Sequence, residues 1–465
     1  MLPLNWAALP SEWALPESLS KNRARATDCF MNADVTIGAG RLAAHPLRAA
    51  VLGEVHARPF TPIETPRRVL HFAFETTAER GEADRAGLTA FCESRGLGGP
   101  RASDKQLRIV SGAMALRWEQ HSEFTTYTWE LPSEPLDDAP FHPPAATVAG
   151  PMSLVPQPGP VLVAIDLHLV RDGGNIAPER LFDRASLAAA ENTDGTALYA
   201  TDFQADPAGF VRILIADRGL GAERAGALTQ RVLELETYRV LALLGLPEAQ
   251  RRAPSVRRIE MWLAEVTAAT RDAQGLDANR RLLEEFTALA AELEAGAAES
   301  QFRFGASRAY DQIVHLRLQT IGERKFDGLP TWTSFLARRM APAIRTITTL
   351  QERQANLAEK LARAANLLRT RVDVELESQN RDVLRSMNER TRLQLMLQAT
   401  VEGLSVAAIS YYVIGLFGYL VKGAHDAGLV RIDPALATGA FVPLALVLVW
   451  WIVRRIRTRH IRGVN

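Results

Sequence analysis

The sequence predicts an α+β protein with a mixed α/β cytoplasmic domain, a helical region containing one very long stalk helix, and a C-terminal transmembrane hairpin. Three observations lead to it: strand-like runs end near residue 220, only helical patterns follow, and two uncharged runs lie near the C-terminus. The predicted parts are the cytoplasmic α/β domain at 1–220, the helical region at 221–340, the stalk helix at 341–399, the hairpin at 400–453 with spans at about 401–421 and 435–453, and a basic cytoplasmic tail at 454–465.

The N-terminal domain is predicted from short runs that alternate in polarity or are rich in β-branched and aromatic residues. Strands are expected at 69–74, 107–110, 113–120, 124–131, 161–170, 197–203 and 210–215, and a short helix at 81–95. A Pro-rich connector at 132–160 follows the first four strands.

Helical patterns fill the chain after residue 220. One helix is expected over 222–244, ending at Gly245-Leu246-Pro247, and others over 257–271, over 279–298 and up to about Gly328. Between Pro342 and Gly403 there is neither Pro nor Gly. This stretch predicts one helix of roughly 60 residues, which is about 90 Å long before it reaches the membrane.

The stalk carries apolar residues at a seven-residue spacing, which predicts a narrow coiled-coil seam. The residues that define it are Leu350, Leu357, Leu361, Ala364, Leu368, Val372, Leu376, Val383 and Met387. We expect the neighbouring helix to come partly from another subunit, so that the chain forms a homo-oligomer through its stalk and spans.

The hairpin is predicted from the two nearly uncharged runs. The first, between Arg392 and Lys422, contains one acid, Glu402, and the second, from Ala435 to Val453, contains no charged residue. Each run holds about 19 uncharged residues, and roughly 20 are needed to cross a ~30 Å hydrocarbon layer as a helix. Because an unsatisfied backbone is costly in lipid, two spanning helices are expected, with the bilayer as a partner.

The basic residues predict the orientation of this hairpin. The loop between the runs has Lys422 and Arg431 offset by two acids, whereas the tail holds Arg454, Arg455, Arg457, Arg459 and Arg462. Positive residues stay on the cytoplasmic side, so both termini are expected there. The N-terminal sequence lacks a basic region followed by an apolar core, so no signal peptide is expected.

Composition limits the partners and the compartment. The chain has 54 basic and 53 acidic residues, which gives no electrostatic indication of nucleic-acid binding. Its two cysteines, Cys29 and Cys92, cannot form a disulfide framework, which fits a reducing compartment.

Four long motifs carry a family resemblance: GEVHARPF at 53–60, FTTYTWELP at 124–132, LLRTRVDVELESQNRDVL at 367–384 and TVEGLSVAAISYYVIGLFGYLVKG at 400–423. Together they resemble the uncharacterised bacterial family that carries domain of unknown function 3422, over essentially the whole chain. The resemblance implies a protein anchored by its C-terminus, which we expect in the bacterial inner (cytoplasmic) membrane, and it implies no activity.

The order of the parts also resembles that of the CorA-type metal-ion transporters, which are oligomeric channels. Their signature Gly-Met-Asn at the outer end of the first span is absent, and the matching place reads Gly415-Leu416-Phe417-Gly418-Tyr419. This departure counts against magnesium selectivity.

The first span supplies the candidates for an ion path. Glu402 lies at its mouth, where it could attract cations if several spans formed a ring, or stay in the interfacial layer. Tyr411 and Tyr412 fall near the middle of the run, and their hydroxyl groups favour a place between helices. Gly415 and Gly418 could line a pore, although close helix packing is the more common use of such glycines.

A second group of candidates lies in the N-terminal domain. Pro59 favours extended backbone before it, which would place Glu54, His56 and Arg58 on one face. That face could bind an anion or a metal, although one His and one Glu are too few ligands for a metal site, and a salt-bridged network is the competing interpretation. His121, Glu123, Glu130 and His168 could complete a metal site only if the fold brings them together.

Two hypotheses of different class follow. In the first, the protein is a CorA-like cation channel or transporter, with a metal cation as a partner. In the second, the hairpin only anchors a cytoplasmic binding or scaffold module. The chain has no phosphate-binding glycine loop, paired Cys motif or Gly-flanked nucleophilic Ser, so an enzyme, catalytic residues and a cofactor are not expected.

Overall fold

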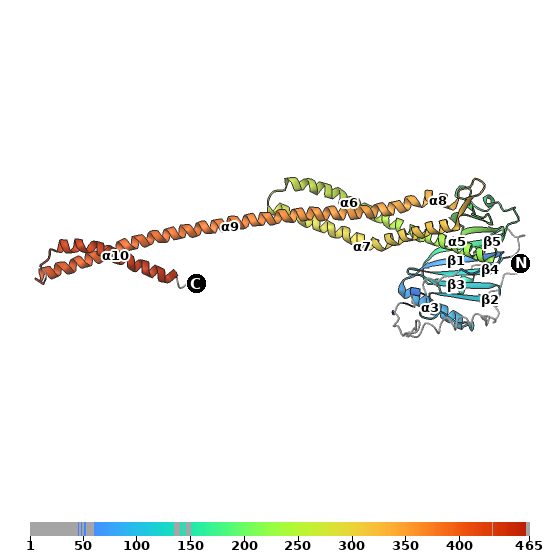
Figure 1. The fold of residues 1–465 in the computed structure, drawn as a ribbon, viewed down its shortest axis with the longest axis horizontal. Helices are drawn as coiled ribbons and strands as arrows, with labels where there is room; N and C mark the ends of the chain where they lie inside the picture. Colours follow the sequence, from blue (N-terminus) through green and yellow to red (C-terminus); the bar gives the residue numbers. More distant parts are fainter. Residues whose placement is uncertain are drawn as a thin grey trace, which may run out of the picture. The chain divides into compact units, whose positions relative to one another are not determined.

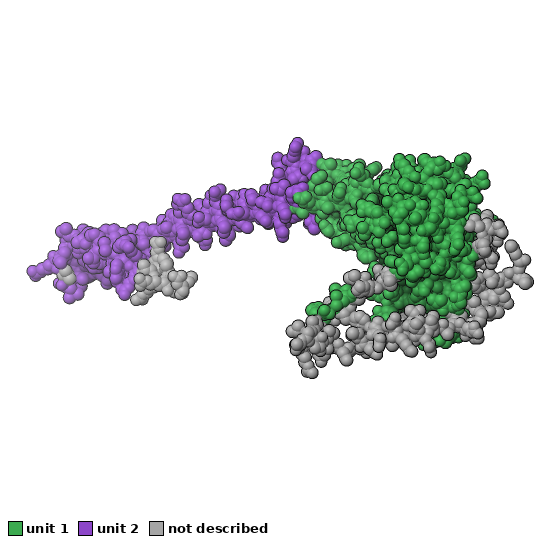
Figure 2. Space-filling model, turned by 45° about the vertical axis from the view of Figure 1, so that its right-hand side comes forward, with its two compact units in different colours: residues 1–265, 288–362 green, residues 266–287, 363–465 purple. Residues whose placement is uncertain are grey.

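The computed structural model describes residues 45, 48, 51–52, 60–133, 140–142, 144–145, 150–429 and 431–461. The chain divides into two compact units, which Figure 2 colours separately. The first unit comprises residues 1–265 and 288–362, and the second comprises residues 266–287 and 363–465. Each unit is described by itself.

One mixed sheet of nine strands organises the first unit (Figure 1). Its strands are β1 (Arg67–Glu75), β2 (Gln106–Ser111), β3 (Met114–Gln120), β4 (Phe124–Pro132), β5 (Val161–Arg171), β6 (Ala188–Asn192), β7 (Ala197–Ala205), β8 (Val211–Asp217) and β9 (Glu323–Lys325). They lie in the order β2-β3-β4-β1-β5-β8-β7-β6-β9. All neighbours are antiparallel except β5 and β8, where Ile165 is level with Val211.

The helices account for most of the remaining described chain. They are α3 (Ala78–Glu93), α5 (Ala222–Leu243), α6 (Gly245–Asp272), α7 (Leu276–Ile321), α8 (Trp332–Arg339), α9 (Ala341–Asp426) and α10 (Pro434–Ile461), with short 3-10 turns η2 (Gly150–Leu154) and η3 (Pro178–Arg180). A sheet with helices segregated along the chain, one of them 86 residues long, confirms the α+β class.

The sheet buries both of its faces. On one face, alternate residues such as Ile165, Leu167 and Ile213 pack against α5, α7 and α8. On the other face, strands β1 to β4 pack against α3 through residues such as Leu88 and Phe91. Because successive side chains point to opposite faces, the apolar runs of β1 and β5 supply both cores at once.

The structure differs from the sequence expectation at several places, including the following three. Helix α6 begins at Gly245 instead of after a break, because Pro247 lies in its first turn, where no N–H is needed. The two helices expected between 279 and 328 are a single helix, α7. Strands β6 and β9 were not expected; β6 reads AAAEN, and alanine gives no strand signal, although all five residues are buried.

The predicted seam of α9 is covered by helices of the same chain over its first part. In the first unit, Leu350, Leu357 and Leu361 are buried, and Arg353 makes two bonds of 3.0 and 2.5 Å to Glu260 of α6. In the second unit, Leu368 and Val372 are buried, and the Arg371 Nη1 atom donates to the carbonyl of Thr270 at 2.8 Å.

The later seam residues have a different environment. Val383 and Met387 are 58% and 59% exposed, and every residue from 377 to 401 is exposed. A coiled-coil partner for this later part stays a prediction.

Candidate functional site

The C-terminal hairpin brings the end of α9 against α10. The rings of Phe417 and Phe441 stack with centroids 3.8 Å apart, and a Cβ placed on Gly418 would lie 3.5 Å from Thr438. Ser410, on the same side of α9 as Phe417, is buried. On α10, Ala445 and Val449 are buried as well. Both helices are long and apolar enough to cross a membrane, by length and composition.

The ion-path candidates of the first span lie on different sides of this hairpin. Tyr411 and Tyr412 are 76% and 75% exposed, so the described chain does not enclose them between its two apolar helices. Gly415 also lies away from α10, because a Cβ placed on it would meet nothing within 4 Å, whereas Gly418 faces Thr438. The two glycines therefore serve different surfaces, and only Gly418 contributes to packing within the chain.

Glu402 belongs to the side of α9 that faces α10. It is half-buried, as are Val406, Ile414 and Phe417, which recur along this side at helical spacing together with the buried Ser410. Glu402 thus shares a side of α9 with residues that pack on α10 and does not lie on the outward surface with Tyr412. Its role in an ion path stays a prediction.

The predicted ligand-binding group of the N-terminal domain, Glu54, His56 and Arg58, lies outside the described residues.

The four strand residues proposed for a metal site do not come together. Glu123 accepts bonds from Arg303 and Tyr310 of α7, whereas Glu130 pairs with Arg108 at 3.1 Å. His121 stacks on Phe124, and His168 lies on the opposite face of the sheet from Glu130. Among the residues that the structure describes, no group of three or more His, Cys, Asp and Glu side chains could hold a metal ion.

The sheet instead buries an ion pair that sequence analysis did not identify. Arg68 of β1 donates from Nε and Nη2 to the two oxygens of Asp166 on β5, at 2.8 and 2.7 Å. His168 lies two residues along β5, with Nε2 3.4 Å from Asp166 Oδ1 and Nδ1 3.4 Å from the backbone N–H of Phe141. Because Nδ1 accepts from that N–H, we assign the proton to Nε2, which then faces the carboxylate.

Burial and pairing act on these groups in opposite directions. Burial alone would raise the pKa of Asp166, but the hydrogen bonds from His168 and Arg68 and the positive charge of Arg68 hold that pKa below its usual range. Burial lowers the pKa of His168, although Asp166 opposes the shift. The cluster is therefore a carboxylate–guanidinium pair next to a neutral imidazole, which joins β1 to β5 and needs no ligand to balance its charge.

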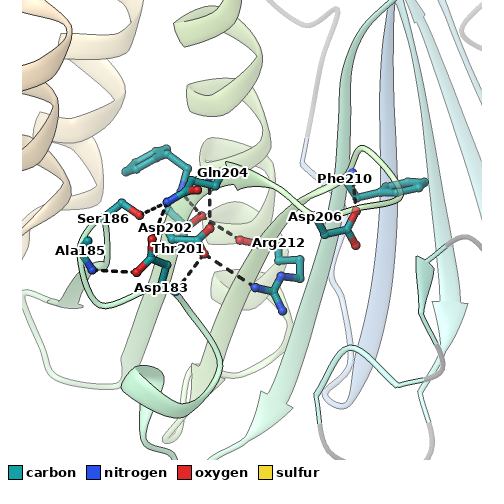
Figure 3. A network of polar contacts seen from close by, with 10 residues as sticks. Asp183, Ala185, Ser186, Thr201, Asp202, Gln204, Asp206, Phe210 and Arg212 are labelled. Carbon is teal, nitrogen blue, oxygen red and sulfur yellow. Dashed lines mark hydrogen bonds and ion pairs between the residues drawn. The ribbon is translucent and has the colours of Figure 1, made fainter.

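A second polar network fixes the bulge of β7 (Figure 3). Asp202 accepts from the backbone N–H of Gln204 at 3.2 Å and from that of Asp183 at 3.1 Å, and it lies 3.7 Å from Arg212. The Gln204 amide in turn donates to Asp183 at 2.9 Å and to Ser186. Backbone N–H groups and neighbouring side chains thus satisfy these acids, which favours a structural role for the network.

A third buried acid, Asp84 of α3, accepts from Tyr127 Oη at 2.6 Å and from Trp118 Nε1 at 2.8 Å. Burial raises its pKa despite these two donors. The same core contains Cys92, whose thiol pKa is raised by burial to about 11, so this cysteine is not a reactive thiolate. These contacts dock α3 on β3 and β4.

The family comparison agrees with the motifs in the sequence. The family described as protein of unknown function (DUF3422) matches residues 43–460. No curated protein and no solved structure matches the chain.

Proposed function

The chain belongs to the DUF3422 family of proteins of unknown function, and we propose that it is a membrane tether: a two-span anchor that holds a folded α+β unit in the cytoplasm. The observation that carries this proposal is the composition of α9. One helix contributes buried seam residues to the first unit and also contains a long apolar segment. The same element can therefore hold the folded unit and anchor it.

The exposed surface of the hairpin supports a lipid environment. Large apolar side chains cover it, including Leu404, Leu416, Leu420, Leu444 and Val447. A soluble protein rarely exposes a continuous apolar surface of this kind, whereas the hydrocarbon layer favours it.

The end of α10 supports the proposed orientation. The guanidinium groups of Arg454 and Arg455 lie over the rings of Trp450 and Trp451, 5.0 and 4.9 Å from their centroids. Tryptophan and arginine together are typical of the membrane interface, and the arginine excess favours its cytoplasmic side. In this proposal the sheet unit binds or positions a partner and catalyses no reaction.

Membrane extraction and cysteine labelling test the tether. The full-length chain should stay in the membrane pellet after alkaline carbonate treatment. In a Cys29→Ser background, Leu429→Cys should react with a membrane-impermeant maleimide in intact spheroplasts, whereas Val464→Cys should react only after permeabilisation. Native Cys92 is buried and serves as an internal blank. Release by carbonate would reject the anchor, and labelling of Val464→Cys in intact spheroplasts would reject the orientation.

A second candidate function is a cation path formed by several copies. The observation that favours it is the outward position of Tyr411 and Tyr412, which gives the span polar groups that do not face α10. Cation flux into proteoliposomes that Glu402→Ala reduces would support this candidate. Absence of flux for a range of monovalent and divalent cations would reject the cation path and leave the membrane tether as the proposed function.

A further inference from the structure

The uncharged side of helix α9 is not the same in its first part as in its later part. Up to Leu368, the side that packs within the chain carries Leu350, Leu357 and Leu361. Beyond Val372 the same heptad positions become Glu375, Ser378, Asp382, Arg385, Glu389 and Arg392. The packing side of the first part therefore continues as a charged, solvated side.

The opposite side of α9 is charged in the first part and uncharged in the later part. Before residue 377 its heptad positions include Glu352, Glu359, Arg363 and Asp373. Downstream, the positions of this stripe alternate by four and three residues and contain no charge: Asn380, Leu384, Met387, Thr391, Gln394, Gln398, Val401, Ser405, Ala408, Tyr412, Gly415 and Tyr419. We call these twelve residues the outer stripe. Such spacing is typical of a helix that packs along another helix.

Every residue of the outer stripe is exposed in the single chain. Helix α10 lies against another side of α9, the one with Ser410, Phe417 and Gly418. A Cβ placed on Gly415 would meet nothing within 4 Å. Within the described residues, the stripe is therefore available along its whole length.

The composition of the outer stripe specifies the kind of partner. Its first half is uncharged and mixes the apolar Leu384 and Met387 with polar residues such as Gln394, and its second half lies in the apolar segment. A helix that covers both halves must itself extend from the water phase into the membrane. Helix α9 of a second copy meets this condition, because the membrane aligns the two copies in parallel.

Two parallel copies also match layer by layer. Identical helices in register place Ala408 against Ala408 and Gly415 against Gly415, and small residues let membrane helices approach closely. The hydroxyl group of Tyr412 then lies at a protein interface instead of in hydrocarbon, where an unpaired hydroxyl is costly. We propose that a second copy of this chain packs in parallel on the outer stripe, from Asn380 to Tyr419; this inference rests on the proposed membrane anchor.

Cysteine cross-linking in membranes tests the interface with matched pairs. In the Cys29→Ser full-length chain, Met387→Cys and Ala408→Cys lie on the outer stripe. Their controls are Glu389→Cys, on the charged side, and Val406→Cys, on the side that faces α10. Mild oxidation should join two chains through the stripe cysteines and should not join them through the controls.

Packing substitutions give a second measurement. Gly415→Ile should lower the assembled fraction of the nanodisc-embedded protein, read by native mass spectrometry, on the order of fivefold or more. Gly439→Ile on α10 is the matched control, because a Cβ there also meets nothing within 4 Å and lies off the stripe. Equal cross-linking on both sides of α9, or a single-chain mass for the unchanged protein, would overturn the inference. Carbonate extraction of the same membranes shows separately whether the anchor itself has failed.

Discussion

Burial of His71 should make the sheet unit sensitive to mild acid. The imidazole lies on β1 between the sheet and α5, with Nδ1 2.8 Å from Thr128 Oγ1 and Nε2 3.1 Å from Thr237 Oγ1. Thr237 donates its own proton to the carbonyl of Leu233, so it must accept from Nε2–H. The neutral imidazole is thereby satisfied, and a second proton at Nδ1 would break the bond from Thr128.

The magnitude follows from the pKa of this imidazole. Burial, and then the positive charge of Arg117 and of His121, lower its pKa from 6.5 to about 3. The unfolded chain therefore takes up a proton near pH 6.5, while the folded chain does not until about pH 3. Between these values stability falls as the pH falls, and at pH 5 the loss is about 2 kcal/mol relative to pH 8.

Hydrogen exchange of the β1 and β4 amides measures this loss locally, after correction for the intrinsic exchange rate at each pH. The His71→Gln variant keeps a donor and an acceptor but cannot titrate, so its opening free energy should fall about 2 kcal/mol less between pH 8 and pH 5 than that of the unchanged chain. His168, whose pKa is also lowered, contributes equally to both proteins and cancels. An identical pH dependence for the two proteins would refute the assignment of a buried, neutral His71.

Two further predictions concern the stability of the fold. Asp166→Asn removes the charge that balances buried Arg68 and should cost about 3–5 kcal/mol in unfolding free energy. The control Arg381→Gln breaks the exposed pair with Glu377 and should change the unfolding free energy by less than about 1 kcal/mol. Equal effects of the two substitutions in thermal or urea unfolding would contradict the burial argument. Gly226→Ala on α5 should destabilise the fold by about 1–3 kcal/mol, because its Cβ would lie 1.9 Å from the Thr61 carbonyl oxygen. Gly305→Ala on α7 should stabilise the fold by about 0.5–1 kcal/mol, because its Cβ would meet nothing within 4 Å. A loss of stability in Gly305→Ala would show that its surroundings are tighter than the structure indicates.

The fold class was predictable because periodicity and breakers are local signals. Strand β4, which reads FTTYTWELP, is recognisable from its β-branched residues. The stalk part of α9 is recognisable from its lack of Pro and Gly between Pro342 and Gly403. The short strand β6 could not be predicted, because AAAEN becomes a strand only by pairing with β7 and β9. Helix α6 illustrates the same limit, since Pro254 lies inside it.

The buried ion pair shows why site residues were harder to predict. Asp166 and His168 are both visible in the strand VLVAIDLHLV as polar residues that point to one face. Their partner Arg68 is 98 residues from Asp166 along the chain, and only the antiparallel pairing of β1 with β5 brings them together. A charged residue within an otherwise buried strand was the available signal, and it indicates that a partner exists without identifying the partner.

The seam of α9 has the same ambiguity, and the lengths of its neighbours resolve part of it. A seven-residue period predicts that some helix packs along α9, whether from the same chain or another. Helices α6 and α7 meet at the turn near Gly275, and Arg371 is bonded to Thr270 close to that turn. Beyond it the described chain offers no helix until α10, and it is there that the uncharged positions move to the opposite side of α9. The seven-residue period alone predicted that some helix packs on α9. The uncharged positions change sides between Val372 and Asn380, and this change separates the part of α9 that is covered within the chain from the part that we assign to a second copy.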